Sequence, residues 1–224
     1  MNTIKENLLK IRNRIAEVAL HNGRNPSEIT LLAVCKNYPI EAIESAFAAG
    51  QLDFAENRVQ ELVRKAPLAP AACRWHLIGH LQRNKVRPAL ENAAVIHSID
   101  SLPLLQRVNR IAEELEISPE IFIEVNISGE ESKFGVSADA VEGLVNEAQS
   151  GPAHCIGLMT MAPFDSSVAE QAAVFSGLRK LRDRLSANTG LELPQLSMGM
   201  SGDYEVAIAE GATILRIGSA IFKK

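Results

Sequence analysis

A lysine near one end of the chain and a glycine-serine pair near the other could together hold a phosphorylated aldehyde. Lys36 ends the apolar run 29–35, and the segment 37–39 (Asn-Tyr-Pro) breaks the chain directly after it. An amine at the mouth of a buried strand can form an imine with an aldehyde. Gly218 and Ser219 follow a second apolar run, where a turn can hold a phosphate.

A further candidate phosphate contact follows the apolar run 195–198. Ser201 or Gly202 would lie near the N-terminus of the next helix, where free N–H groups and the helix dipole favour an anion. Taken singly, Ser201 is as well explained as a helix cap and Gly218 as a chain turn. Together, at the ends of two successive strands, they favour a phosphate site. Combined with Lys36, they predict the cofactor pyridoxal 5′-phosphate (PLP).

Two charged residues need an account of their own. Lys36 alone could be an ordinary solvated lysine, but a barrel wall around it would desolvate the amine and make it a better nucleophile. Arg216 interrupts the apolar run 213–217 and therefore needs a partner. That partner is either a carboxylate in a structural salt bridge or the ring nitrogen of PLP. An arginine at the ring nitrogen weakens the ring as an electron sink, which permits racemisation but disfavours decarboxylation and transamination.

Several polar residues follow other predicted strands. Glu56 and Asn57 end one strand and Asn126 ends another; each could contact the cofactor's 3′-oxygen or a bound amino acid, or could be a turn or cap residue. Lys133 is expected in a loop, as a surface charge or as an anion contact at the rim.

Metal and disulfide chemistry are not indicated. His76 and His80 lie four residues apart in a strand-to-loop segment without an HExxH pattern, so we expect no metal there. Cys35, Cys73 and Cys155 are odd in number, widely spaced and without a CxxC motif. This pattern fits a reducing compartment and excludes a disulfide framework.

The composition restricts the class of protein. The chain has 224 residues, 46% of them hydrophobic, with a net charge of −4. The acidic balance argues against nucleic-acid binding, and the densest basic stretch, 83–87, is interpreted as a solvated helix face. The N-terminus lacks a signal-peptide pattern, and no apolar run has the length of a membrane span. We expect a soluble, cytoplasmic protein with no membrane partner.

The hydrophobic pattern alternates between strands and helices. Ile4, Leu8, Ile11 and Ile15 recur at helical spacing in an amphipathic helix over 3–21. Strands are predicted at 29–34, 52–55, 75–78, 94–99, 121–127, 154–158, 195–198 and 213–217. Helices are predicted at 39–49, 57–65, 83–90, 101–115, 137–149, 168–187 and 202–210.

Eight strands separated by helices predict an α/β fold, a single (β/α)8 TIM-type barrel domain over 1–224 with no second β domain. Residues 219–224 are too few for an eighth barrel helix, so the N-terminal helix is expected to cover the gap beside strand eight. The alternative is an open doubly wound sheet, which normally carries a GxGxxG turn that this chain lacks.

Between about residues 30 and 222 the chain resembles the pyridoxal phosphate homeostasis protein family, whose members look like the barrel domain of alanine racemase standing alone. The segments that carry this resemblance are Leu32-Ala-Val-Cys-Lys36 with Pro39, Phe54-Ala-Glu-Asn57 with Val59-Gln-Glu61, Trp75-His-Leu-Ile-Gly79 with Leu81-Gln82 and Asn84-Lys85, Val125-Asn126, Lys133 with Gly135, Gly157-Leu-Met159, Leu196-Ser-Met-Gly-Met-Ser201 with Asp203, and Arg216-Ile-Gly218 with Ile221-Phe222.

The resemblance implies a role for each candidate residue. Lys36 would be the Schiff-base lysine, and Arg216 would face the pyridine nitrogen. Asn57 would lie near the cofactor. Phosphate would be bound by Ser201, Gly202, Gly218 and Ser219.

The chain departs from the family pattern at a few positions. Cys35 and Asn37 stand where serine and threonine are usual, and Ala55 and Arg58 where glycine and tyrosine are usual. The customary glycine after Ile221-Phe222 is absent. None of these departures removes a proposed ligand.

The resemblance favours a carrier over an enzyme. Alanine racemase uses a second base, a tyrosine from a β-rich domain that acts across a dimer, and this chain has no such domain. We therefore expect a monomeric protein that buffers or delivers PLP, with apo PLP-dependent enzymes as possible recipients. The alternatives are a PLP-dependent amino-acid racemase or lyase of low activity, and a barrel that has lost its ligand and acts through protein partners.

Overall fold

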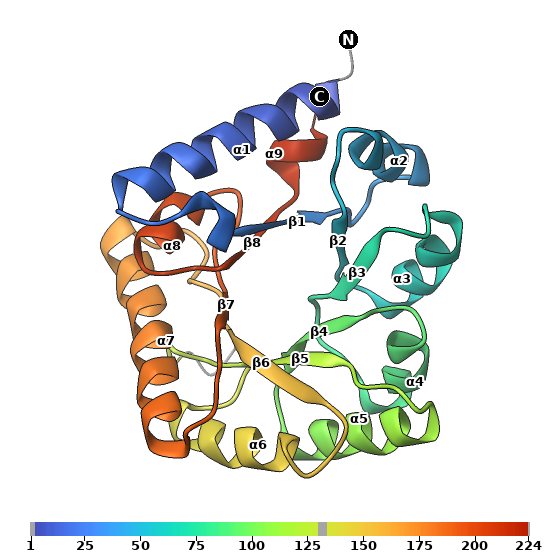
Figure 1. Cartoon of the computed structure of the whole chain (residues 1–224), viewed down its shortest axis with the longest axis vertical. Helices are drawn as coiled ribbons and strands as arrows, with labels where there is room; N and C mark the ends of the chain where they lie inside the picture. Colours follow the sequence, from blue (N-terminus) through green and yellow to red (C-terminus); the bar gives the residue numbers. More distant parts are fainter. Residues whose placement is uncertain (1–2, 130–133, 224) are drawn as a thin grey trace.

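Eight parallel strands form a closed barrel in chain order (Figure 1). The computed structural model describes residues 3–129 and 134–223. The strands are β1 (Thr30–Val34), β2 (Asp53–Glu56), β3 (Arg74–Leu77), β4 (Val95–Ile99), β5 (Glu120–Glu124), β6 (His154–Met159), β7 (Gln195–Ser197) and β8 (Ile214–Ile217). Pairing of β8 with β1 closes the ring, from Thr30 opposite Ile214 to Ala33 opposite Ile217. The predicted barrel is confirmed.

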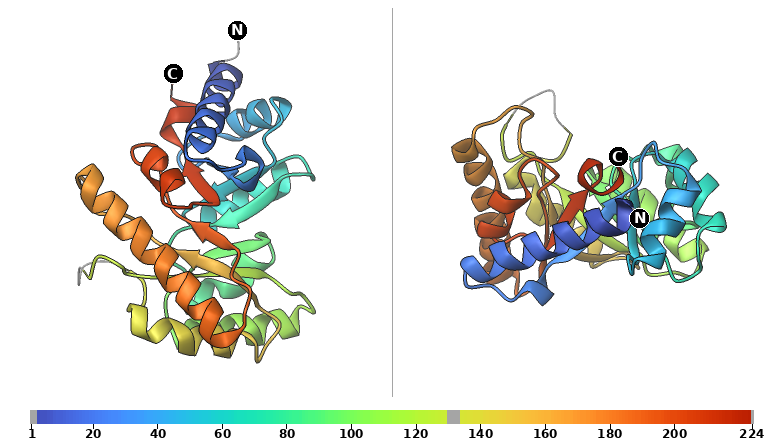
Figure 2. Two further views of the ribbon diagram at one scale, coloured as in Figure 1. Left: turned by 60° about the vertical axis from the view of Figure 1, so that its left-hand side comes forward. Right: turned by 90° about the horizontal axis from the view of Figure 1, so that it is seen from above.

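Helices surround the barrel and connect successive strands (Figures 1 and 2). They are α1 (Thr3–His21), α2 (Ile40–Ala48), α3 (Val59–Lys65), α4 (Val86–Leu90), α5 (Leu102–Glu114), α6 (Val141–Ala148), α7 (Val168–Thr189), α8 (Tyr204–Ala209) and α9 (Ser219–Phe222). Short 3-10 turns lie at Pro26–Glu28, Ala66–Leu68, Arg83–Lys85 and Ala138–Ala140.

Side-chain alternation divides the core into two layers. Because successive strand residues face opposite sides, one set fills the barrel and the other packs under the helices. The barrel interior contains a compact apolar cluster, formed by Leu32, Val34, Ala55, Val95, Phe122, Met159 and Ile214. A much larger cluster joins the outward faces of the strands to the helices. This alternation decides which polar side chains reach the barrel axis.

The N-terminal helix lies where the sequence pattern placed it. In α1, the buried side chains Leu8, Ile11, Ile15 and Val18 form one face, and the helix packs against α2, α8 and α9. Figure 2 shows α1 running alongside α9. The chain after β8 forms only the one-turn helix α9, so α1 covers the space that a full eighth helix would occupy.

The main differences from the expected elements are at their ends. The predicted strand 121–127 ends at Glu124. The N–H of Val125 still donates to the carbonyl of Met159 in β6, but the N–H of the next residue, Asn126, donates to the carbonyl of Val136 instead. The predicted helix 202–210 begins only at Tyr204. The helices expected at 83–90 and 137–149 begin as 3-10 turns.

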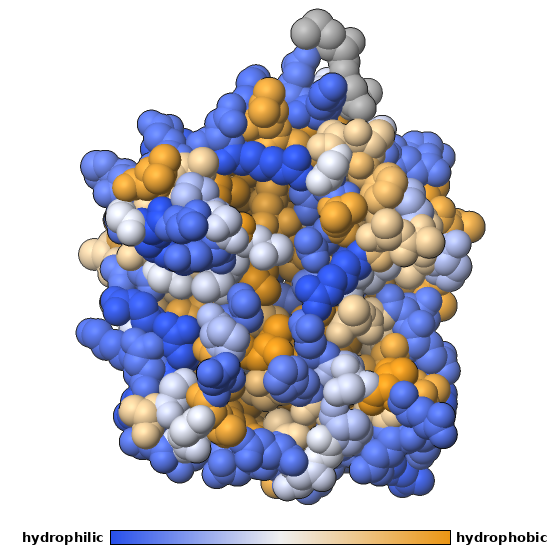
Figure 3. Space-filling view, viewed as in Figure 1, coloured by the Kyte–Doolittle hydropathy of each residue, from blue (hydrophilic) through white to orange (hydrophobic). Residues whose placement is uncertain are grey.

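Hydropathy follows this layered arrangement. Figure 3 shows the molecule from the same side as Figure 1. Hydrophilic residues dominate the periphery of this face, and apolar residues are visible toward its centre. Among the described residues, no helix combines the length and the apolar character that a membrane crossing requires.

Candidate functional site

Lys36 stands on a tight turn at the carboxyl end of β1. The backbone N–H of Tyr38 donates to the carbonyl of Cys35 at 3.1 Å, and Asn37 has a left-handed φ of 68°. Asparagine is one of the few residues besides glycine that adopts this conformation readily. The turn leaves Lys36 exposed at the mouth of the barrel. The expectation that the barrel wall desolvates this lysine is therefore wrong.

The loop after β7 presents free backbone donors. At Gly199, with φ +95°, an added Cβ would lie 2.6 Å from the Cβ of Ala207, so the sharp turn requires glycine. The carboxylate of Asp203 accepts a hydrogen bond from the N–H of Met200 at 2.5 Å. No described residue accepts a hydrogen bond from the backbone N–H of Ser201 or Gly202. Asp203, rather than Ser201, occupies the N-cap of α8, so the helix-cap explanation of Ser201 is wrong.

The second loop follows the neighbouring strand β8. Gly218 packs against β1, and an added Cβ would lie 2.9 Å from the carbonyl oxygen of Val34. Ser219 is exposed at the first position of α9. In the described part of the chain its backbone N–H also finds no acceptor. The two loops therefore offer hydroxyl and N–H donors at adjacent strand ends, which fits a phosphate group.

Arg216 is buried inside the barrel, only 4% exposed. Its Nη1 donates to Ser197 Oγ at 2.7 Å and its Nη2 to the carbonyl of Thr160 at 3.0 Å. None of the ion pairs among the described residues involves it, so the structural salt bridge is not its role. Burial lowers the pKa of Arg216 to about 10, against the opposing effect of Glu124 and Asp203. The guanidinium therefore remains charged at neutral pH.

Glu124 is a buried carboxyl that the sequence did not single out. It ends β5 with the same orientation as Phe122, two residues earlier, which packs inside the barrel. Burial raises the pKa of Glu124 to about 7; Asp100 acts in the same direction and Arg216 opposes it. A carboxyl that titrates near neutrality beside a buried cation is typical of functional sites.

Asn57 and Glu56 diverge although they are neighbours in the sequence. Asn57 is half-buried and lines a hollow of about 490 Å³ together with Arg58, His80 and Lys85. Glu56 faces outward and is fully buried, and its carboxylate accepts a hydrogen bond from Lys65 Nζ of α3 at 2.5 Å. The suggested contact of Glu56 with the cofactor is therefore wrong, since strand alternation turns it away from the barrel axis.

The other polar candidates have local partners. The side chain of Asn126 accepts from the N–H of Gly129 at 3.0 Å, as expected of a turn residue. His80 pairs with Asp100 at 2.9 Å, and His76 bonds to His97 at 2.9 Å. Among the described residues, no group of three His, Cys, Asp or Glu side chains is arranged to hold a metal ion. Lys133 lies outside the described residues.

The three thiols are free, and burial raises the pKa of each. Cys35 is fully buried, and its thiol donates toward the carbonyl of Ala55 at 3.3 Å. Burial, and secondly Glu56, raise its pKa far above the ordinary thiol range. Burial also raises the pKa of Cys155 to about 11. Cys35 therefore adjoins Lys36 in sequence but faces the opposite side of the strand.

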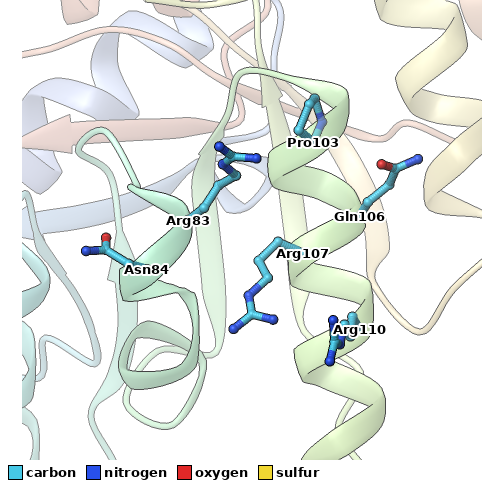
Figure 4. A pocket seen from close by; sticks show the side chains of 6 residues that line it. All are labelled: Arg83, Asn84, Pro103, Gln106, Arg107 and Arg110. Carbon is cyan, nitrogen blue, oxygen red and sulfur yellow. The ribbon is translucent and has the colours of Figure 1, made fainter.

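The basic stretch 83–87 contributes to a separate concavity on the outer wall. Arg83, Asn84 and the α5 side chains Arg107 and Arg110 line a hollow of about 500 Å³. In Figure 4 the side chain of Arg83 extends toward α5, whereas that of Asn84 points away from it. This hollow lies between the helices around the barrel and does not include the residues at its mouth. Arg83 of the basic stretch 83–87 is exposed, as the predicted solvated face requires.

Comparisons with known proteins agree with this geometry. The family described as "Alanine racemase, N-terminal domain" matches residues 2–224. The chain is 42% identical to the pyridoxal phosphate homeostasis protein of Pseudomonas aeruginosa, over 99% of this chain and 96% of that protein. It is 40% identical to the protein of the same name from Escherichia coli K12, over 99% and 97%.

Solved structures show the same relationship. PipY of Synechococcus elongatus with PLP bound is 38% identical, with a TM-score of 0.87 over 98% of this chain and 99% of that one. The alanine racemase of Clostridium difficile 630 shares the fold, with a TM-score of 0.79 over 99% of this chain and 56% of that one, but only 14% identity. The chain therefore belongs to the family of pyridoxal phosphate homeostasis proteins, built on the alanine racemase N-terminal barrel.

Proposed function

We propose that the chain binds PLP at the carboxyl-terminal mouth of its barrel and serves in PLP homeostasis. The observation that carries this proposal is the combination of the exposed Lys36 with the two donor loops after β7 and β8. Bound PLP supplies an aldehyde that an amine can hold covalently and reversibly. Relatives at 38–42% identity carry the name pyridoxal phosphate homeostasis protein, and one relative was solved with PLP bound.

In this proposal each candidate residue holds one part of the ligand. Lys36 forms the imine, and Ser201, Gly202, Gly218 and Ser219 bind the phosphate through their hydroxyl and N–H groups. Arg216 would face the ring nitrogen. Asn57 would lie near the cofactor.

The positions of the two tyrosines favour a carrier over an efficient racemase. Tyr38 packs on Phe222, with ring centroids 4.8 Å apart. Tyr204 lies near Glu205 and Arg14 of α1. Neither contact places a phenol opposite Lys36 as a second base, which favours holding PLP over turning over amino acids. We therefore infer that the protein buffers PLP and hands it to apo-enzymes. The cytoplasmic location and the monomeric state stay predictions from the sequence.

The proposal is tested by PLP retention. The double variant S201A/S219A should bind PLP roughly tenfold or more weakly, because each serine loses a hydrogen bond to a charged group. Lys36→Ala should lose the covalent attachment altogether. Equilibrium dialysis with absorption detection measures both, and Ser176→Ala on the exposed face of α7 is the control. Retention of PLP by the double variant at the level of the control would refute the phosphate assignment.

The competing function is a PLP-dependent racemase or lyase of low activity. Incubating the PLP-loaded protein with single amino acids and resolving the enantiomers by chiral chromatography separates the two. Turnover that disappears in Lys36→Ala would favour the enzyme.

A further inference from the structure

A chain of five hydrogen-bonded polar side chains crosses the barrel interior. It begins at Asp53, the first residue of β2, and runs through His76, His97 and Ser197 to Arg216. His76 Nε2 lies 3.3 Å from Asp53 Oδ1, and His76 Nδ1 lies 2.9 Å from His97 Nε2. His97 Nδ1 lies 2.8 Å from Ser197 Oγ, which in turn accepts from Arg216 Nη1 at 2.7 Å.

The members come from five strands and are almost entirely enclosed. His76, His97, Ser197 and Arg216 are each at most 4% exposed. Only Asp53, at the amino-terminal end of the barrel, reaches solvent, with its side chain 25% exposed. The chain therefore connects solvent at the amino-terminal end of the barrel with the guanidinium beneath the opposite mouth.

The two ends determine the direction of every hydrogen bond. A guanidinium can only donate and a carboxylate can only accept. Burial lowers the pKa of both His76 and His97, so both rings are neutral at neutral pH and each has one N–H. His76 must then donate through Nε2 to Asp53 and accept at Nδ1.

The same logic continues along the chain. Because His76 accepts at Nδ1, His97 donates through Nε2 and accepts at Nδ1. The Ser197 hydroxyl therefore donates to His97 and offers a lone pair to Arg216. In all four bonds the donor lies on the Arg216 side and the acceptor on the Asp53 side. At no point in the chain do two donors or two acceptors face each other.

The result is a guanidinium held in one orientation. Ser197 fixes Nη1 and the Thr160 carbonyl fixes Nη2, so described residues accept from two of the five N–H donors of Arg216. The backbone of Arg216 is fixed as well, because its N–H donates to the carbonyl of Gly199 at 2.9 Å. Gly218, in the loop after β8, follows two residues later.

We propose that His97 and His76 are positioning residues, which act through Ser197 to hold Arg216 toward the ring nitrogen of bound PLP, with Asp53 setting the direction of the chain from the opposite end of the barrel. This inference rests on the proposed PLP site. The hydrogen-bonded chain itself belongs to the protein without cofactor and can be tested there.

The first test uses the protein freed of PLP. Long-range ¹H–¹⁵N correlation spectra of histidine-labelled protein report which ring nitrogen holds the proton. Both His76 and His97 should be Nε2–H tautomers in the wild type and in Asp53→Asn, whose amide oxygen can accept the same bond. Asp53→Leu should lose the defined tautomer at both rings. An Nδ1–H tautomer of His97 in the wild type would overturn the chain.

The second test uses the PLP-loaded protein. His97→Phe keeps the ring shape against Phe122, on which His97 stacks with centroids 4.4 Å apart, but gives Ser197 no acceptor. It should shift the visible band of bound PLP and weaken retention about tenfold, because a guanidinium that Ser197 no longer orients would lose its hydrogen bond to the ring nitrogen. His97→Asn, whose amide oxygen can accept from Ser197, should recover most of both.

The outcomes separate the inference from the proposed function. Failure of the wild-type protein to take up PLP would refute the proposed PLP site. The histidine tautomers would still test whether the hydrogen-bonded chain from Asp53 to Arg216 exists. Spectra and affinities unchanged in both His97→Phe and Asp53→Leu would refute the positioning role. Equal shifts in His97→Phe and His97→Asn would also refute it, because the bond to Ser197 would then not matter. If His97→Phe fails to fold, the spectrum and PLP affinity of Asp53→Leu, at the solvent-facing end of the chain, test the positioning role instead.

Discussion

At the scale of single residues, Lys36 and Cys35 show how strand alternation assigns neighbouring side chains to different tasks. Lys36 is exposed at the mouth, while Cys35 is buried on the outward face of β1 against Ala55 and Glu56. A buried, protonated thiol neither reacts with oxidants nor competes with the amine for an aldehyde. The cysteine found here in place of the family's serine therefore leaves the amine chemistry unchanged.

This assignment predicts selective thiol labelling. Brief treatment of the native protein with iodoacetamide should modify Cys73, which is partly exposed, well before Cys35. Peptide mass mapping with and without denaturant measures the order, and full labelling in denaturant is the control. Rapid alkylation of Cys35 in the folded protein would contradict its burial.

Glu124 is the second residue whose environment has a measurable consequence. Burial raises its pKa from an ordinary 4.5 to about 7. Between these values the folded state keeps a proton that the unfolded chain releases, so the free energy of unfolding falls as the pH rises from 4.5 to 7 and then levels off. The contribution is at most on the order of 3 kcal/mol.

Glu124→Gln should remove this part of the pH dependence. Urea unfolding of the PLP-free protein at a series of pH values gives the two stability profiles. The variant should lack the fall between pH 4.5 and 7, and the solvent-exposed change Glu192→Gln should leave the profile unchanged. Parallel profiles for wild type and Glu124→Gln would show that Glu124 titrates normally.

At the scale of elements, the buried ion pair between β2 and α3 fastens the helix behind the site to the barrel. Lys65 Nζ donates to Glu56 Oε1 and to the carbonyl of Cys35 at 3.0 Å, with both charged side chains at most 2% exposed. Glu56 Oε2 has no hydrogen-bond partner among the described residues. Such a pair is costly to break, because the remaining charge stays buried.

Lys65→Met should therefore lower the free energy of unfolding by ~3–5 kcal/mol. The double variant Glu56→Leu/Lys65→Met removes both charges and should recover most of that loss. Chemical denaturation compares the three proteins, with the exposed ion pair partner Arg64→Met as the control, for which less than about 1 kcal/mol is expected. A single variant as stable as the control would contradict the tightly held buried ion pair.

The same element shows what the sequence could and could not predict. Hydrophobic periodicity located all eight strands, because each is a short apolar run between turn residues. The orientation of Glu56 was not predictable, since a four-residue strand gives too few positions to distinguish inward from outward faces. The start of α8 was missed because Asp203 occupies its N-cap and also accepts from the N–H of Met200, which keeps residues 201–203 in a turn before the helix.

At the scale of the whole molecule, the barrel brings together residues that are far apart in the sequence. Lys36 and the pair Gly218-Ser219 were predictable because each follows a recognisable strand at the same barrel end. The chain from Asp53 to Arg216 was not, because its members lie on five strands and only closure of the barrel places them in contact. A line of hydrogen-bonded side chains drawn from five strands is visible only in three dimensions.

The most direct test of the central claim is borohydride reduction of the protein after incubation with PLP, followed by peptide mass mapping. We expect a yellow protein whose reduced form carries one pyridoxyl group on Lys36, while the buried Lys65 remains unmodified. A colourless protein that takes up no PLP, or an adduct confined to other lysines, would contradict the assignment of the barrel mouth as the PLP site.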